Sequence, residues 1–418
     1  MKKYIISIIT VIVLVINTTI INAQENLETQ YLLKIGITDS LNSKILNEKR
    51  DFWVQLPENY NPKSVEKYPV AYILDGSIHL NTLHTVHSYY SGGYFPEMIL
   101  VGISNRTNRT RDLTTSQVKK FQGTELDKNT GGAEKFTQFI ENELIPYIDS
   151  KYATTSYRTL IGHSYGGLFT INTLINHPYL FENYLAIDPS LDWDHQKLLN
   201  EAKIKLQNDD YSGKSLFISL NGQLDMQNSA ITIDNVMEDT SNFTLFPRSN
   251  IAFSNIVRQN TNNGLSFEWK FYPNDIHGTI ALPSIMDGLL SIFEWYQMEN
   301  TDKINSFDTP KEELLSIIKY RAKKLQTHFG YAVPPYPEEL LNMSGYMNMD
   351  MQQPEKAKMY FEQAIEYYPN SANAYDSLAD YYESQNDYQN ALKYVTKAFE
   401  LNENDYYKKR METFKAKN

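Results

Sequence analysis

The residues from Gly162 to Gly166, Gly-His-Ser-Tyr-Gly, place a serine between two glycines. The run Thr159 to Ile161 before them is strand-like and the run Leu168 to Ile175 after them is helical, so Ser164 stands where a strand turns sharply into a helix. Such a turn strains the serine's backbone, and a Cβ at either glycine would collide with the neighbouring strand or helix. The pattern therefore predicts a serine hydroxyl that is presented as a nucleophile.

A serine hydroxyl is a weak nucleophile at neutral pH, so it needs a histidine base later in the chain. His277 follows the strand-like run Leu265 to Tyr272 and precedes the helical run Pro283 to Tyr296. A loop after a late strand is where such a base belongs, and we predict His277 as the general base. His163 adjoins the serine but should point away from it at the turn. The histidines on a probable early helix are ordinary candidates for packing or surface positions: His79, His84 and His87.

The carboxylate that orients the base is predicted at the end of the strand before the histidine strand. The run Ser215 to Leu220 ends close to Asp225, which we take as the third member of the triad. Asp188, at the end of the strand-like run Tyr184 to Ile187, is an alternative, although an aspartate there is also typical of a turn. Two further alternatives follow it: Asp192 and Asp194. A serine–histidine dyad would itself retain much of the chemistry.

The tetrahedral intermediate of acyl transfer needs two backbone N–H donors aimed at its oxyanion. Tyr165, the residue after the nucleophile, supplies the first. The apolar run Val70 to Leu74 ends in Asp75-Gly76-Ser77, where the glycine lets the chain bend so that the amide of Ser77 faces the site. Without the serine turn, this segment would read as a simple turn.

Several of these segments together resemble the putative-esterase branch of the α/β-hydrolases. That branch includes enterochelin-type siderophore esterases, feruloyl and acetyl-xylan esterases, S-formylglutathione hydrolases and mycolyltransferases. The resemblance covers about residues 40 to 300, and the segments that carry it occur in the family's order: Lys67 to Gly76, Glu143 to Ile148, Gly162 to Gly167, Ala186 to Leu191 and His277 to Thr279.

The resemblance implies an α/β-hydrolase fold, a mostly parallel sheet flanked by helices, and a serine esterase. It implies Ser164 as nucleophile, His277 as base and the amides of Ser77 and Tyr165 as the oxyanion hole. The chain departs from the family's pattern in two places. Relatives often read Ser-Pro-Ser with paired tryptophans where this chain has Asp-Pro-Ser-Leu-Asp-Trp from position 188, and the stretch around Asp225 matches them only loosely.

A loop from Ser104 to Thr115 carries three arginines after the strand-like run Met98 to Ile103. In this fold such a loop lies at the rim of the active site, so Arg109 and Arg111 are candidate substrate-binding residues for an anionic ester, with Arg106 nearby. Arginines in loops are also commonly just solvated. An aromatic cluster could stack an aromatic acyl group or simply pack: Tyr89, Tyr90, Tyr94 and Phe95. A polysaccharide acyl ester, a siderophore ester and a thioester all remain open.

The first 23 residues read as a signal peptide. Two lysines precede the apolar stretch Tyr4 to Ile16, and Asn22-Ala23 forms a small-residue cleavage site. An apolar stretch of 13 residues is shorter than the ~20 that a membrane-spanning helix needs. We therefore expect an exported protein, periplasmic or secreted, with no stable membrane insertion after the signal is removed.

Composition excludes several classes of function. The formal net charge of −11 makes nucleic acid a poor partner. The chain has no cysteine, and therefore no disulfide, thiolate metal site or cysteine nucleophile. No Gly-rich phosphate loop or His-Glu-x-x-His pattern occurs, so we predict neither a cofactor nor a catalytic metal. The expected substrate is a small-molecule or glycan ester.

A second part follows the esterase domain, which we place at 24–300. Residues 301–337 read as a helical linker, with a helix over Glu312 to Thr327 and a proline-rich break after it. Residues 338–418 repeat with a period of 34 and resemble the tetratricopeptide helix-turn-helix. The paired positions are Leu341 with Tyr375, Gly345 with Ala379, Ala357 with Ala391, Phe361 with Val395, and Ala364 with Ala398.

Two repeats are fewer than a freestanding array needs, so we expect them to pack on the 312–327 helix or on the catalytic domain. They could bind a protein partner or serve only as a docking appendage. An alternative function is a catalytically idle hydrolase scaffold that works as a tetratricopeptide binding module. The presence of Ser164, His277 and both oxyanion positions favours the enzyme, because a scaffold has no chemical need for that set.

Overall fold

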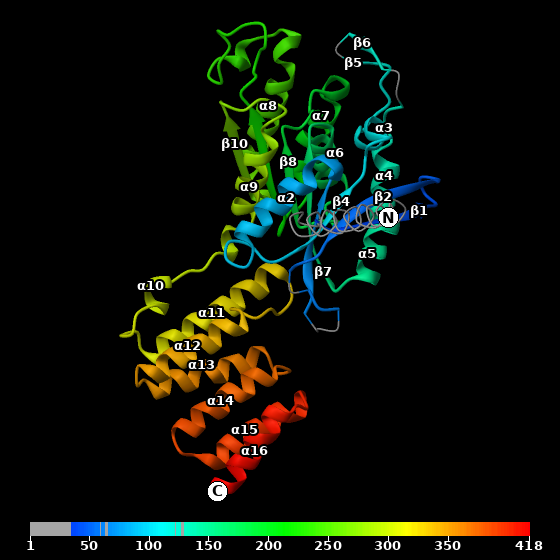
Figure 1. Cartoon of the computed structure of the whole chain (residues 1–418). Helices are drawn as coiled ribbons and strands as arrows, with labels where there is room; N and C mark the ends of the chain where they lie inside the picture. Colours follow the sequence, from blue (N-terminus) through cyan, green and yellow to red (C-terminus); the bar gives the residue numbers. More distant parts are fainter. Residues whose placement is uncertain (1–34, 59, 63–65, 122, 127–128) are drawn as a thin grey trace, which may run out of the picture. The chain divides into compact units, whose positions relative to one another are not determined.

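The computed structural model describes residues 35–58, 60–62, 66–121, 123–126 and 129–418 (Figure 1). The predicted signal peptide at 1–23 lies outside the described residues. The chain divides into two compact units, with the boundary between Glu294 and Trp295, a few residues before the predicted domain boundary at 300.

The first unit is built on one eight-stranded sheet. Strands β1, β2 and β4 pair antiparallel, and all further pairs across the sheet are parallel. Central strands such as β3, β4 and β8 are buried along their whole length, which is why they read as continuous apolar runs rather than alternating ones. The strands, in their order across the sheet, are β1 (Ile37–Ser43), β2 (Glu48–Gln55), β4 (Ile99–Ile103), β3 (Tyr68–Ile73), β7 (Thr154–His163), β8 (Asn183–Ile187), β9 (Ser215–Asn221) and β10 (Ser266–Tyr272).

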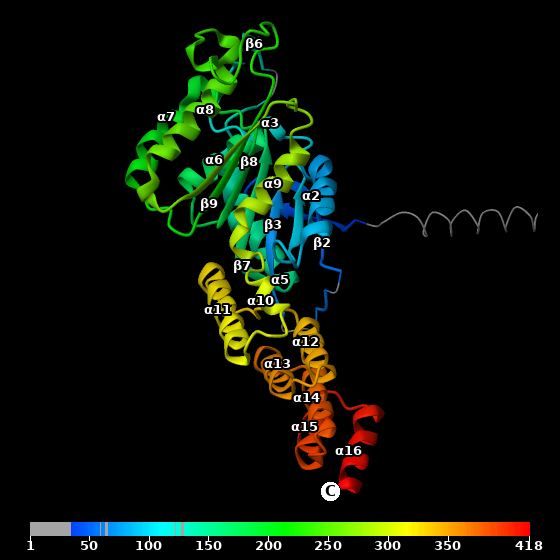
Figure 2. The ribbon, with the colours of Figure 1, turned by 90° about the vertical axis from the view of Figure 1, so that its left-hand side faces the viewer.

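Helices cover both faces of this sheet (Figure 2). Successive residues of β8 point to opposite faces: Tyr184 belongs to the main hydrophobic cluster, whereas Leu185 lies against Gly288 on the other side. Helices α2 and α9 contact each other on the Leu185 side, and α4 to α8 pack on the main cluster. Their bounds are α2 (Gly76–Tyr90), α3 (Arg109–Leu113), α4 (Ala133–Phe139), the π-helical turn η1 (Ile140–Leu144), α5 (Ile145–Lys151), α6 (Tyr165–Asn176), α7 (Trp193–Asn208), α8 (Leu245–Gln259) and α9 (Ala281–Ile292).

Smaller elements complete this unit. A two-stranded ribbon lies outside the main sheet, formed by β5 (Lys120–Phe121) and β6 (Thr124–Glu125). Short 3₁₀ turns occupy η2 (Val236–Glu238), η3 (Asn242–Thr244) and η4 (Thr261–Asn263), and a further one, η5 (Glu294–Tyr296), spans the boundary to the second unit.

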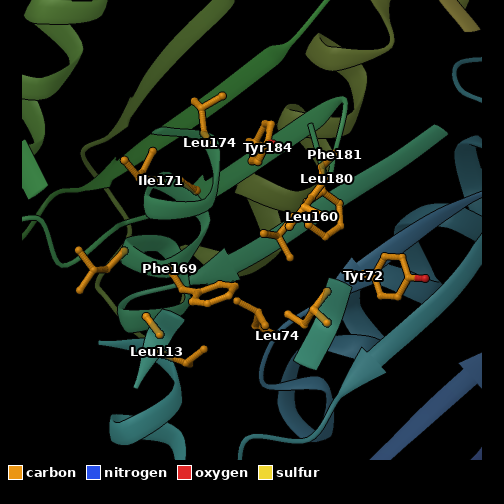
Figure 3. Packing of buried hydrophobic residues seen from close by; sticks show 14 of the residues in the cluster. Tyr72, Leu74, Leu113, Leu160, Phe169, Ile171, Leu174, Leu180, Phe181 and Tyr184 are labelled. Carbon is orange, nitrogen blue, oxygen red and sulfur yellow. The ribbon is translucent and has the colours of Figure 1, made fainter. Parts of the chain in front are cut away.

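Helix α6 is held by the core of the unit. Figure 3 shows its side chains Phe169, Ile171 and Leu174 among Leu160 of β7 and Tyr184 of β8, all of them fully buried. This burial fixes the start of α6 relative to the ends of the parallel strands. The layers, helices on both faces of a mostly parallel sheet, confirm the predicted α/β-hydrolase fold.

The second unit is entirely helical. Helices α12 and α13 form the first repeat and α14 and α15 the second, as the 34-residue period predicts. A Cβ on Gly345 would lie 2.4 Å from the Phe361 ring, and the equivalent Ala379 packs in a cluster with Ala391 and Val395, so small residues let each pair approach closely. The helices are α10 (Thr301–Ile304), α11 (Lys311–Phe329), α12 (Glu338–Asp350), α13 (Pro354–Tyr367), α14 (Ala372–Ser384), α15 (Tyr388–Leu401) and α16 (Asp405–Lys417).

The predicted linker is part of this second unit. Leu314 and Ile318 of α11 share a hydrophobic cluster with Leu341 and Tyr360 of the first repeat. The expected packing of the repeats on this helix is therefore confirmed, and 301–337 is better described as a first element of the repeat unit. Among the residues that the structure describes, no helix combines the length and the apolar character needed to cross a membrane.

Candidate active site

Ser164 occupies a strained turn between β7 and α6. Its φ of 61° and ψ of −117° are unusual for a residue with a side chain. Its N–H donates to Ile187 O at 2.9 Å, and its carbonyl accepts from Ser190 N–H at 3.1 Å. These two bonds tie the turn to the end of β8. The strand-turn-helix setting predicted for Ser164 is thus present.

The glycines around Ser164 differ in how much space an added side chain would have. A Cβ on Gly162 would lie 2.2 Å from Gly166 O, so glycine is required there. A Cβ on Gly166 would meet Leu74 at 3.5 Å, an ordinary contact, whereas one on Gly167 would lie 2.8 Å from the Pro189 side chain. The prediction that Gly166 must lack a side chain is wrong, because the close approach falls one residue later.

His277 lies in the loop after β10 and is hydrogen-bonded to Asp188. Its Nδ1 is 2.5 Å from Asp188 Oδ2, and its backbone N–H donates to Gln223 Oε1 at 3.1 Å. The imidazole is 41% exposed, whereas the Asp188 side chain is fully buried. This bond directs Nδ1 to the carboxylate and leaves Nε2 for a second partner.

Asp188 is held at the end of β8 by several contacts. Its backbone N–H donates to Ser219 O at 3.1 Å, and its Oδ1 accepts from Asn221 N–H at 3.1 Å. The Asn221 side-chain amide donates to Oδ2, the same oxygen that contacts His277. A buried carboxylate is stable only when it is paired and hydrogen-bonded, and these donors meet that requirement.

The prediction that Asp225 pairs with His277 is wrong. Asp225 Oδ1 instead accepts from the N–H groups of Gln227 at 2.7 Å and Asn228 at 3.1 Å, the pattern of a turn that the side chain closes on itself. The acid comes from the end of β8, one strand earlier than expected. Asp188 was kept as an alternative from the sequence, but its left-handed φ of 45° and its Asn221 partner gave no signal there.

His163 lies beside His277. Its ring centroid is 4.5 Å from that of His277 and 5.4 Å from that of His79. Burial lowers the pKa of His163 to about 3, helped by the neighbouring His277, so this ring stays neutral near the base. The contact between the His163 ring and His277 was not expected from the sequence.

The serine hydroxyl has a near neighbour from the β8 loop. Ser164 Oγ lies 3.4 Å from Ser190 Oγ and makes no hydrogen bond to His277 in the described part of the chain. In resting enzymes the bond from nucleophile to base is often long and tightens only with substrate. Ser164 is nevertheless linked to both His277 and Asp188 through neighbouring residues. The ring of His163, the residue before the serine, contacts His277. Ile187 and Ser190, which lie on either side of Asp188, form hydrogen bonds with the backbone of Ser164.

The two predicted oxyanion amides both lie in first turns of helices. Tyr165 is the first residue of α6 and Ser77 the second residue of α2, and N–H groups in a first turn have no intrahelical partner. The helix N-terminus also favours negative charge. A Cβ on Gly76 would lie 2.5 Å from the Gly102 backbone, which explains why a glycine precedes Ser77.

The three arginines of the loop after β4 have different surroundings. Arg109 Nε donates to Asp75 Oδ2 at 2.9 Å, and its guanidinium lies 5.3 Å from the centre of the Tyr165 ring. Arg111 is paired with Glu48 and Asp112, both at 2.6 Å, and its contact with a substrate stays a prediction. Arg106 is exposed.

Among the aromatic residues near position 90, Phe95 is a packing group, whereas Tyr89 and Tyr94 are exposed. Phe95 is fully buried among His87, Tyr90 and Phe293. The aromatic ring that reaches the base is Phe246 of α8, whose centroid lies 5.7 Å from that of His277. No pattern in the sequence distinguishes Phe246 from other aromatic residues.

Two other features concern ligands. Three side chains of the site each have a donor atom within 4.8 Å of the others, close enough to converge on a cation: His163, Asp188 and His277.

A cavity of about 190 Å³ lies elsewhere, between α4, α6 and α7, and neither Ser164 nor any of those three residues lines it. Its lining is Thr115, Ala133, Glu134, Asn172, Asn176, Lys197, Leu198 and Glu201.

Comparison with known families agrees with this geometry. Residues 43–234 match the family described as "Putative esterase". This match confirms the resemblance to the putative esterases that the sequence indicates. Residues 338–404 match the tetratricopeptide repeat, in agreement with the period of 34.

Several curated proteins that are similar to the first unit are named as siderophore esterases. The ferri-bacillibactin esterase of Bacillus subtilis is 33% identical over 173 residues, which is 37% of this chain and 59% of the relative. The siderophore triacetylfusarinine C esterase of Aspergillus fumigatus is 30% identical over 149 residues, 32% of this chain and 48% of the relative. The chain thus spans about half to three fifths of the length of these relatives.

Solved structures extend the likeness. An IroE-like serine hydrolase from Shewanella oneidensis is 27% identical with a TM-score of 0.65, and the match covers 79% of this chain and 99% of that one. An uncharacterised protein from Capnocytophaga ochracea is 18% identical with a TM-score of 0.59 over 91% of this chain and 99% of that one, a likeness of fold alone.

Proposed function

We propose that this protein is a serine esterase that hydrolyses carboxylic esters through an acyl-enzyme on Ser164. The observation that carries the proposal is the hydrogen bond between His277 Nδ1 and Asp188 Oδ2, made next to a serine in a strained turn. That bond holds the imidazole in the tautomer whose Nε2 can accept the serine proton.

The proposed reaction has two stages. Ser164 Oγ attacks the ester carbonyl and passes its proton to His277 Nε2, while the amides of Ser77 and Tyr165 stabilise the oxyanion. The intermediate collapses to the acyl-enzyme, and His277 gives the proton to the departing alkoxide. Water, deprotonated by His277, then attacks the acyl-enzyme and releases the acid with regeneration of Ser164.

The proposed substrate is a siderophore ester. The support comes from the names of the curated relatives, which include a ferri-bacillibactin esterase and an apo-salmochelin esterase. Their names cover both an iron-loaded and an iron-free siderophore, so each form has to be tested here. Feruloyl and acetyl-sugar esters are the competing classes from the wider family resemblance.

We further propose that the chain is exported to the periplasm or secreted after removal of residues 1–23. The basic start, the short apolar stretch and the small-residue site before Gln24 support this. Amino-terminal sequencing of the protein from cell fractions should give a start at Gln24 outside the cytoplasm. A start at Met1 in the cytoplasmic fraction would contradict export.

A hydrolysis panel tests the function. The purified chain from Gln24 onward should release p-nitrophenol from the acetate and butyrate esters, and Ser164→Ala should not. Iron-loaded and iron-free triscatecholate siderophores are then compared with feruloyl and acetylated-sugar esters by kcat/KM. Highest kcat/KM for a siderophore supports the substrate class, and highest kcat/KM for a feruloyl or acetyl ester contradicts it. Failure to hydrolyse any ester would contradict the enzyme itself.

A further inference from the structure

We propose that Arg109 is a positioning residue that fixes the two proposed oxyanion donors, the amides of Ser77 and Tyr165, relative to each other. The inference rests on the proposed esterase function, since it concerns the donors that stabilise its tetrahedral intermediate. It differs from the sequence-based expectation that Arg109 receives an anionic substrate.

On one side, Arg109 holds the segment that leads to Ser77. Its Nε donates to Asp75 Oδ2 at 2.9 Å, and the Asp75 side chain is only 5% exposed. Asp75 has a left-handed φ of 51°, and its carboxylate makes no capping bond to helix α2. The same loop also supplies Asn105, whose Oδ1 accepts from Asp75 N–H at 3.1 Å. The segment after β4 therefore fixes both the backbone and the side chain of Asp75, which lies two residues before Ser77.

On the other side, Arg109 contacts both neighbours of the nucleophile. Its Nη2 donates to His163 O at 3.3 Å, and its guanidinium lies 5.3 Å from the centre of the Tyr165 ring. Tyr165 carries the second proposed oxyanion amide. One side chain thus joins the Asp75–Ser77 segment to the 163–165 turn, two segments that come from different strand ends.

The chemistry of arginine suits this task. A guanidinium is planar and donates in several fixed directions at once, and its face stacks on an aromatic ring. A lysine ammonium is a point charge that cannot make the same set of contacts. An oxyanion hole works only when its donors are placed beforehand, because a displaced donor loses much of its effect on the developing charge. Arg109 would therefore act on kcat, without touching the reacting atoms.

The decisive comparison uses Arg109→Lys and Arg109→Gln, with Arg106→Gln as the matched control. Arg106 belongs to the same loop and is exposed, so its variant removes one charge without the bridging contacts. The substrates are 4-acetoxybenzoate and its methyl ester, which differ in charge but share the scissile acetyl group. Acetate release, inhibition by an alkyl trifluoromethyl ketone and circular dichroism are measured for every variant.

If Arg109 positions the oxyanion hole, both of its variants should lose about 10- to 100-fold in kcat on the charged and the neutral ester alike. KM should change less than about twofold, and affinity for the ketone, which forms a tetrahedral adduct, should fall in the same proportion as kcat. Asp75→Asn should give a similar loss of kcat. The double variant with Arg109→Gln should lose little more, because both substitutions disrupt the same contact between Arg109 and Asp75.

Other results would overturn the inference. Full kcat in Arg109→Lys would show that charge alone suffices, and a raised KM restricted to 4-acetoxybenzoate would make Arg109 a receptor for the substrate's charge. An inactive wild type would instead contradict the proposed function. In that case a crystal structure of Arg109→Gln decides the inference separately: displaced residues 75–77 support it, and an unchanged segment refutes it.

Discussion

Asp188 and His277 lie 89 residues apart in sequence, yet Asp188 Oδ2 is 2.5 Å from His277 Nδ1. The carboxylate is fully buried at the end of β8, and Asn221 donates to both of its oxygens. A rigid, buried acid of this kind can fix the orientation of a more exposed imidazole. The pair thereby fixes the orientation of the imidazole, whose ring contacts His163 of the serine turn.

Replacing the acid should separate the two candidate aspartates. Asp188→Asn should lower kcat on p-nitrophenyl butyrate by about 10²- to 10⁴-fold, because an amide cannot hold the imidazole in the productive tautomer. Asp225→Asn is the control and should change kcat less than about threefold. Both variants are compared by steady-state kinetics after circular dichroism. A larger loss in Asp225→Asn than in Asp188→Asn would contradict the pairing seen here.

The sequence placed Ser164 and His277 in the turn and the loop where the structure has them, but it favoured Asp225 over Asp188 as the carboxylate beside His277. Ser164 and His277 are recognisable because a glycine-flanked serine and a late strand-end histidine have few other readings. The acid is harder, because several strands end in an aspartate. The features that distinguish Asp188 are burial, left-handed backbone geometry and the approach of Asn221 from β9, which depend on the packed sheet.

The glycines of the serine turn should respond unequally to alanine. Gly162→Ala should abolish soluble expression or lower the melting temperature sharply, because its Cβ would fall 2.2 Å from Gly166 O. Gly166→Ala should melt within a few degrees of wild type, since its Cβ meets Leu74 at 3.5 Å within a helix. Thermal unfolding followed by circular dichroism checks both. Equal destabilisation by the two substitutions would mean that the turn is packed differently.

Buried His87 should make the first unit sensitive to acid. Burial lowers the pKa of His87 to about 4, and its Nε2 accepts from Met98 N–H at 2.9 Å, which requires the neutral ring. The unfolded chain takes up this proton below about pH 6.5 and the folded chain only below about 4, so the contribution to stability is present above pH 6.5 and falls between these values. We expect a loss of about 1–2 kcal/mol from this residue between pH 7 and pH 5.

His87→Gln provides the test, because an amide oxygen can accept from Met98 N–H without titrating. Urea unfolding is followed by tryptophan fluorescence, since three of the four tryptophans, Trp53, Trp193 and Trp269, lie in the first unit. The variant should lose less stability than wild type between pH 7 and pH 5. An identical pH dependence in the two proteins would remove His87 as a cause.

The repeat unit should be dispensable for small esters. Every residue assigned to the site precedes Glu294, whereas Trp295 stacks on His328 at 4.2 Å within the second unit. A chain ending at Glu294 should therefore keep kcat on p-nitrophenyl butyrate within about twofold per folded molecule. A lower melting temperature would support docking of the repeats on the esterase unit. Loss of kcat/KM on siderophores alone would show that the repeats recruit substrate. Loss of kcat on the small ester would contradict the prediction that the first unit hydrolyses it without the repeats.

Much of the fold could be inferred from periodicity. The fully buried strands β3 and β8 give continuous apolar runs, and the spacing of small residues such as Gly345 and Ala379 gives the period of the repeats. The sequence predicted that the repeats pack on the helix within 301–337, but the assignment of this segment to the repeat unit rests on contacts with Leu341 and Tyr360 that form only on folding. The partners of the two arginines in α3 could not be predicted either. Arg109 pairs with Asp75 and Arg111 with Glu48, and the fold brings these carboxylates to them from distant parts of the sequence.

Covalent labelling of Ser164 tests the central claim most directly. The purified chain is treated with a fluorophosphonate, and the labelled peptide is identified by mass spectrometry while the turnover of Ser164→Ala is measured in parallel. We predict one label per chain on Ser164, none on Ser190 although its Oγ lies 3.4 Å away, and a fall in kcat of about 10⁴- to 10⁶-fold in Ser164→Ala. A label on Ser190, or more than about a tenth of wild-type turnover in a folded Ser164→Ala, would contradict the proposed mechanism.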